Sequence, residues 1–292
     1  MSTTETAARR YAGIEDWPMP DIVDALIESQ MAAIAAVHGL RAGLATATEA
    51  AAERLQGGGR LIYLGAGTSG RIATQDAAEL APTFAWPAER ALSLMAGGNR
   101  AFTDAIEGAE DDGPAAIAAL DAVGVGPSDV VVGIAASGRT PFTVEGLAHA
   151  RALGALTIGV YNNAGGRLGE VCDHPLLAPT GAEAVAGSTR LKAGTAQKAV
   201  LNCLSTGVML RLGFVYRGRM VEMRPTNDKL QARAVGMVAD LTGAETAVAE
   251  RALAAAGGAI KTAVVMLTLG LEADAARARI AAAGGTLRAA LA

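Results

Sequence analysis

Residues 59–71, GRLIYLGAGTSGR, join a short apolar run to a turn of glycine and hydroxyl residues that opens a helical pattern. Similar apolar runs recur at 91–95, 130–135 and 156–160, and Ala-rich helical stretches separate them. Uninterrupted apolar strands that alternate with helices are typical of a parallel sheet with both faces covered. The sequence therefore predicts an α/β fold built from strand–helix–strand units.

Helical patterns flank this α/β stretch on both sides. From residue 21 to about residue 57, apolar residues recur at helical spacing, and three glycines end the run. A long helical pattern covers 189–212, and short helices broken by glycine pairs follow to residue 292. We therefore expect three parts: an N-terminal helical segment at 1–57, an α/β domain at 58–225 and a C-terminal helical region at 226–292.

The composition argues against several classes of protein. Hydrophobic residues make up 51% of the 292 residues, and 29 acidic against 25 basic residues give a net charge of −4. Because a nucleic-acid surface needs a basic stripe, we expect no nucleic-acid partner. Cys172 and Cys203 have neither a disulfide pattern nor the spacing of metal ligands, so we expect no metal site and a reducing compartment.

The chain shows no clear membrane or export signal. The N-terminus lacks an apolar leader segment. The most membrane-like stretch, 252–271, carries Lys261 near its middle, and a charge at the centre of a bilayer is costly. We therefore expect a cytoplasmic protein with no membrane partner, in which residues 252–271 form a buried pair of helices.

The first glycine-rich turn, residues 65–71, matches the pattern G-x-G-x-x-G. A dinucleotide site of this kind also needs an acidic residue about 20 positions on, at the end of the next strand. That strand ends Leu94-Met95-Ala96-Gly97 with no carboxylate. The pattern instead favours a simpler anion site at a helix N-terminus, formed by backbone N–H groups and the Thr68 and Ser69 hydroxyls. A tight turn without a ligand is the alternative.

Two further hydroxyl-rich turns precede helices. In residues 135–141, AASGRTP, Ser137 and Thr140 are three apart and can face one anion, and Gly138 lets the backbone approach it closely. In residues 187–198, GSTRLKAGTAQK, Ser188 begins a helix that carries Lys192. A Ser/Thr helix cap with solvated lysines is the alternative interpretation of this third turn.

The two Ser/Thr turns on a parallel sheet resemble the sugar isomerase (SIS) fold, whose members hold phosphosugars. Residues 181–198, GAEAVAGSTRLKAGTAQK, are similar to the signature shared by N-acetylmuramic acid 6-phosphate etherases and the glucokinase regulatory protein. The segments EGAED (107–111), VVVGIAASGRTPF (130–142) and TNDKL (226–230) match the etherases in order and spacing. The resemblance is dense from 59 to 230 and weak over the first forty residues.

The resemblance implies a SIS-type parallel sheet, a phosphorylated amino-sugar substrate, a homodimer and no cofactor or metal. It implies Glu79 as the proton donor and Glu110 as the second active-site glutamate, here the base, with Glu183 and Asp76 as alternative carboxylates. The apolar sequence neighbours of Glu79 predict that its side chain is partly buried. The expected substrate- and phosphate-binding residues are Gly67, Thr68, Ser69, Ser137, Gly138, Arg139, Thr140, Ser188 and Lys192.

The implied reaction removes a D-lactyl ether from C3 of the sugar. Opening the ring gives an aldehyde at C1, which acidifies the C2 proton and makes the C3 oxygen a leaving group. One base and one acid suffice for this elimination, and water then adds at C3. Two alternatives stay open: an aldose–ketose isomerase, which also begins with proton abstraction at C2, and a sensor that binds a phosphosugar without chemistry.

Overall fold

The computed structural model describes residues 2–225 and 227–292, so Thr226 of the TNDKL segment lies outside the described residues. The chain divides into two compact units. One unit comprises Met1–Ala78 and Ala88–Ser205, and the other comprises Glu79–Pro87 and Thr206–Ala292.

A five-stranded parallel sheet, in the order β2-β1-β3-β4-β5, forms the centre of the first unit. Every residue of β1, β3 and β4 is buried, which explains their unbroken apolar sequences and confirms the predicted α/β class. The strands are β1 Leu61–Gly65, β2 Ala91–Met95, β3 Val130–Ile134, β4 Leu156–Tyr161 and β5 His174–Leu177. The sequence analysis missed β5, which carries Pro175; a strand at the edge of a sheet tolerates proline.

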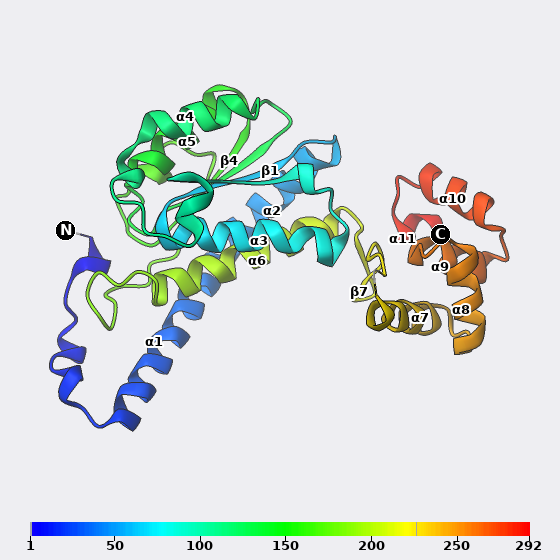
Figure 1. The fold of residues 1–292 in the computed structure, drawn as a ribbon, viewed down its shortest axis with the longest axis horizontal. Helices are drawn as coiled ribbons and strands as arrows, with labels where there is room; N and C mark the ends of the chain where they lie inside the picture. The colour runs from blue at the N-terminus through cyan, green and yellow to red at the C-terminus, as the bar shows by residue number, and fades with distance from the viewer. Residues whose placement is uncertain (1, 226) are drawn as a thin grey trace. The chain divides into compact units, whose positions relative to one another are not determined.

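Helices cover both faces of this sheet: α4 and α5 lie on one face, and α2, α3 and α6 on the other (Figure 1). The helices are α1 Met19–Gly39, α2 Arg41–Gln56, α3 Gly67–Phe84, α4 Gly113–Ala122, α5 Pro141–Ala152 and α6 Lys192–Arg211. The helical run expected from 21 to 57 is two helices, because Leu40 leaves the helical conformation between them. Between β2 and α4 the chain forms two short 3-10 helices, Gly98–Phe102 and Ala109–Asp111.

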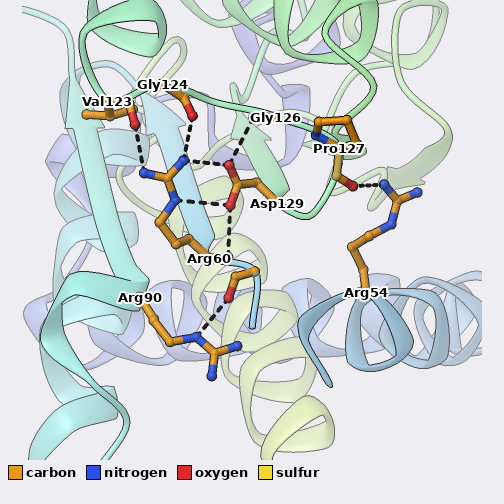
Figure 2. A network of polar contacts seen from close by, with 9 residues as sticks. Arg54, Arg60, Arg90, Val123, Gly124, Gly126, Pro127 and Asp129 are labelled. Atoms are coloured by element: carbon orange, nitrogen blue, oxygen red, sulfur yellow. Dashed lines mark hydrogen bonds and ion pairs between the residues drawn. The ribbon is translucent and has the colours of Figure 1, made fainter. Parts of the chain in front are cut away.

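An ion pair fastens β1 to β3 at their amino-terminal ends. Arg60 donates to both carboxylate oxygens of Asp129, at 3.0 and 2.6 Å, and to the carbonyls of Val123 and Gly124 (Figure 2). Asp129 also accepts the backbone N–H groups of Arg60 and Gly126. Burial alone would raise the pKa of the Asp129 carboxyl, but these hydrogen bonds and the guanidinium charge hold that pKa below its ordinary value.

The second unit is helical with one short hairpin and has its own apolar core, which includes Val238, Leu253 and Val264. The elements are β6 Val215–Tyr216, β7 Arg219–Met220, α7 Asp228–Thr242, α8 Thr246–Ala255, α9 Ile260–Leu269, α10 Ala273–Ala282 and α11 Leu287–Ala290. α8 and α9 meet at 116°, so a helix pair is present as expected, but it begins at Thr246 and not at residue 252. Lys261 is buried there, pairs with Glu222 and donates to the Gly285 carbonyl at 2.6 Å.

Candidate active site

The loops after β1 and β3 begin side by side, because Gly65 and Ile134 are register partners at the carboxyl ends of these strands. β1 pairs with β2 on one side and β3 on the other, so the strand order reverses between β1 and β3. Open parallel sheets bind ligands in the crevice at such a switch point. The first loop leads into α3 and the second into α5, so two helix N-termini begin beside this crevice.

A cavity of about 510 Å³ lies at this position. Its lining includes seven of the residues that the sequence analysis selected: Gly67, Thr68, Ser69, Glu110, Ser137, Arg139 and Thr140. Gly138 and Ser188 are chain neighbours of lining residues but do not line the cavity themselves, and neither Lys192 nor Glu79 lines it. The structure therefore brings together the first two loops, Gly187 and Thr189 of the third loop, and one of the two predicted glutamates.

The first loop needs its glycines for close approach between strand and helix. A Cβ on Gly70 would lie 2.8 Å from the carbonyl oxygen of Gly65, too close for any side chain. Gly67 has a φ of +53°, in the left-handed region that favours glycine. The G-x-G-x-x-G pattern is thus explained by packing of α3 onto β1, and Thr68 and Ser69 fall in the first turn of the helix.

In the second loop, neither the Ser137 nor the Thr140 hydroxyl donates a hydrogen bond to the described part of the chain. Ser137 Oγ accepts the backbone N–H of Arg139 at 3.1 Å, so the hydroxyl proton is available to donate. Thr140 precedes α5 and makes no side-chain capping bond to it. Gly138 has a φ of +67° and lies against Gly166, where a Cβ would be only 3.0 Å from the Gly166 Cα. The loop therefore presents two hydroxyls beside the α5 N-terminus, an arrangement suited to an anion.

Lys192 and Glu183 form the start of α6 instead of lining the cavity. The fully buried Glu183 carboxylate accepts the N–H groups of Lys192 and Ala193 at 3.0 and 2.9 Å, and so caps the helix. The Lys192 ammonium donates to the Ala182 carbonyl. Burial lowers the pKa of Lys192, and the negative charge of Glu183 opposes that shift. Both side chains therefore hold the third loop in shape.

Asp76 also has a structural role, because its carboxylate is hydrogen-bonded inside the protein. Its carboxylate accepts hydrogen bonds from Tyr63, Asn202 and Ser205, at 2.5, 2.7 and 3.3 Å, in the buried interior. Burial and the neighbouring Asp76 carboxylate raise the pKa of Tyr63 well above its ordinary value. This network joins α3 to β1 and α6.

The two predicted acid–base residues occupy different places. Glu110 lies in the 3-10 helix Ala109–Asp111, exposes its side chain and lines the cavity. Glu79 follows Thr68 by eleven positions on α3 and does not line the cavity. The side chain of Glu79 is exposed, so the partial burial expected from its apolar sequence neighbours is not found in the single chain.

The sequence analysis missed the residues at the start of the chain. Thr4 and Glu5 belong to the 3-10 helix Thr3–Glu5 and line the same cavity. Their position depends on hydrogen bonds to Asn163, about 160 positions away. No local sequence pattern indicates such a contact.

Known proteins show which family has this architecture. Residues 43–151 match the family described as "Glucokinase regulatory protein N-terminal SIS domain", and residues 117–206 match the "SIS domain" family. The chain is 48% identical over 270 residues to a Deinococcus radiodurans protein named N-acetylmuramic acid 6-phosphate etherase, covering 92% of this chain and 88% of that protein. A Mycolicibacterium smegmatis protein of the same name is 46% identical over 276 residues, covering 94% and 93%. The chain belongs to the N-acetylmuramic acid 6-phosphate etherase family.

Proposed function

We propose that this protein cleaves the D-lactyl ether of N-acetylmuramic acid 6-phosphate, giving N-acetylglucosamine 6-phosphate and D-lactate. It is then a carbon–oxygen lyase of cell-wall sugar recycling. The observation that carries this proposal is the cavity that joins two hydroxyl-rich loops to Glu110, in a chain nearly half identical to relatives of that name.

The phosphate is held by the first two loops. Thr68, Ser69, Ser137 and Thr140 donate hydroxyl hydrogen bonds to its oxygens, and Arg139 adds positive charge at the cavity wall. The N-termini of α3 and α5 contribute partial positive charge and unpaired backbone N–H groups. These contacts fix C6 of the sugar and leave C2 and C3 to the acid–base groups.

Elimination then follows from proton transfers alone. Glu110 removes the C2 proton, and the C1 aldehyde of the ring-opened sugar accepts the electron pair as an enolate. The C3–O bond breaks as Glu79 protonates the departing lactyl oxygen. Water adds to the resulting double bond, with its hydroxyl at C3 and a proton at C2, and forms the product sugar.

Glu79 is not among the residues that line the cavity of the single chain, which favours an active site completed by a second chain. α1 carries a row of exposed apolar side chains at helical spacing: Met19, Val23, Ile27, Met31 and Ile34, exposed by 46–68%. α1 is also long and apolar enough to cross a membrane. We favour a cytoplasmic homodimer in which this face packs against a second copy, because large exposed apolar patches usually mark interfaces.

One assay separates this function from its alternatives. Purified protein is incubated with N-acetylmuramic acid 6-phosphate, and D-lactate and the sugar products are measured. The proposal expects equal amounts of D-lactate and N-acetylglucosamine 6-phosphate. A rearranged sugar without lactate would indicate an isomerase, and binding without any product would indicate a sensor; either result refutes the proposed reaction.

A further inference from the structure

The first residues of the chain form part of the cavity that contains the phosphate loops. Thr4 is 1% exposed, and both Thr4 and Glu5 line the cavity together with Ser69, Ser137 and Thr140. We call residues 3–5 the N-terminal strap. In Figure 1 the strap lies beside the loop that precedes α6, consistent with the hydrogen bond from the Gly187 N–H to the Thr4 carbonyl at 2.9 Å.

The strap is fastened by a buried amide. Asn163, which follows β4 and is 1% exposed, accepts hydrogen bonds from the Thr3 hydroxyl at 2.7 Å and from the Thr4 N–H at 3.2 Å. The Asn163 amide nitrogen donates to the Thr4 hydroxyl at 3.1 Å and to the Ala136 carbonyl at 2.8 Å. Asn163 therefore links the strap by hydrogen bonds to the second loop, residues 135–141, through Ala136.

These contacts set the position of the Glu5 side chain. Its carboxylate lies over Gly187, where a Cβ would come within 2.8 Å of Glu5 Oε2. Among the described residues, the exposed Glu5 carboxylate has no hydrogen bond or ion pair with the protein. Both of its oxygens are therefore available to accept hydrogen bonds from a ligand in the cavity.

We propose that Glu5 is a substrate-binding residue that accepts a hydrogen bond from a neutral donor of the sugar, a hydroxyl or the amide N–H. This inference rests on the proposed function. The phosphate and the lactyl carboxylate are anionic and are repelled by Glu5, so only the neutral donors of the substrate suit it. Glu5 consequently distinguishes a phosphorylated amino sugar from phosphate alone.

The test compares two ligands by calorimetry on the full-length protein. N-acetylglucosamine 6-phosphate carries sugar donors and phosphate, whereas inorganic phosphate carries phosphate only. In Glu5→Ala, the Kd of the sugar phosphate should rise about tenfold or more, while the Kd of inorganic phosphate stays level or falls. Glu5→Gln should show a smaller rise, because its amide oxygen still accepts. Glu15→Gln, an exposed glutamate of the same N-terminal segment outside the cavity, is the control and should change neither Kd.

A pair of glycine variants moves Glu5 without removing it. Gly187→Ala places a methyl group against the Glu5 carboxylate, at a φ of +76°. Gly181→Ala imposes the same backbone strain, at a φ of +73°, in open space. If Gly187→Ala raises the Kd of the sugar phosphate more than Gly181→Ala does, while the Kd of inorganic phosphate does not rise, the position of the Glu5 carboxylate matters for binding. Equal effects of the two variants would contradict the inference.

Three results would overturn the inference. Unchanged affinities in Glu5→Ala would mean that Glu5 touches no ligand. A parallel rise of both Kd values would mean that the strap only supports the loops. A fall of both Kd values would mean that the Glu5 carboxylate competes with the phosphate group and weakens ligand binding. Because these measurements need no turnover, they remain valid if the wild-type protein releases no D-lactate, a result that would refute the proposed function itself.

Discussion

Removal of the second-loop hydroxyls tests where the phosphate binds. The change is Ser137→Ala combined with Thr140→Val, which keeps the size of both side chains close to the original. Ser137 Oγ already accepts the Arg139 N–H, and no protein hydrogen bond to the Thr140 hydroxyl is found among the described residues, so both hydroxyl protons are available to a phosphate oxygen. A hydrogen bond to a charged group contributes about 1.5–3 kcal/mol, so the pair contributes about 3–6 kcal/mol.

Each 1.4 kcal/mol of lost binding energy raises a dissociation constant about tenfold, so we expect KM to rise at least about a hundredfold. We expect kcat to change only a few-fold, because C2 and C3 are remote from the phosphate. The assay is steady-state release of D-lactate across substrate concentration. Thr46→Val on the exposed surface of α2, where the hydroxyl bonds only its own helix, is the control. A KM within twofold of wild type would refute the assignment, and so would a large loss of kcat at unchanged KM.

Three further predictions concern the chemistry and the scaffold. In deuterium oxide, Glu79→Gln should still exchange the C2 hydrogen while releasing D-lactate about 10²–10⁴-fold more slowly, whereas Glu110→Gln should lose both; the opposite pattern would reverse the two roles. Activity should survive dialysis against EDTA, because the proposed steps are proton transfers between side chains and substrate, and restoration by an added divalent metal would contradict this. Asp129→Asn should lower the free energy of unfolding at pH 7 by about 2–3 kcal/mol, because it weakens the pairing with Arg60. Since the folded-state pKa of Asp129 is lowered, its contribution is present above the unfolded pKa of about 3.9 and is lost as pH falls through the folded value. The difference between wild type and variant in urea unfolding should therefore shrink toward pH 3, and a constant difference would refute the linkage.

The sequence by itself determined the elements whose causes are local. The strand over Leu61–Gly65 could be predicted because its residues are all buried and therefore all apolar. The first residues of two helices, Gly67 and Pro141, could be predicted from sequence. The glycine, hydroxyl and proline residues that begin such helices are consecutive in the chain. Glu110 could be placed only through the family resemblance, since a run of acidic residues alone is typical of a solvated surface.

Only the tertiary structure decided which of these residues share a cavity. Glu183 and Lys192 have the residue types of a catalytic pair, yet packing turns them inward to cap and brace α6. Glu79 follows Thr68 on the same helix, yet Thr68 lines the cavity and Glu79 does not. Glu5 shows the converse, since the hydrogen bonds of Asn163 to Thr3 and Thr4 bring the first residues of the chain into the cavity. Local patterns record hydrogen bonding and burial within a turn or a strand, whereas contacts across 160 positions depend on how the whole sheet and its loops pack, and no short segment of sequence contains that information.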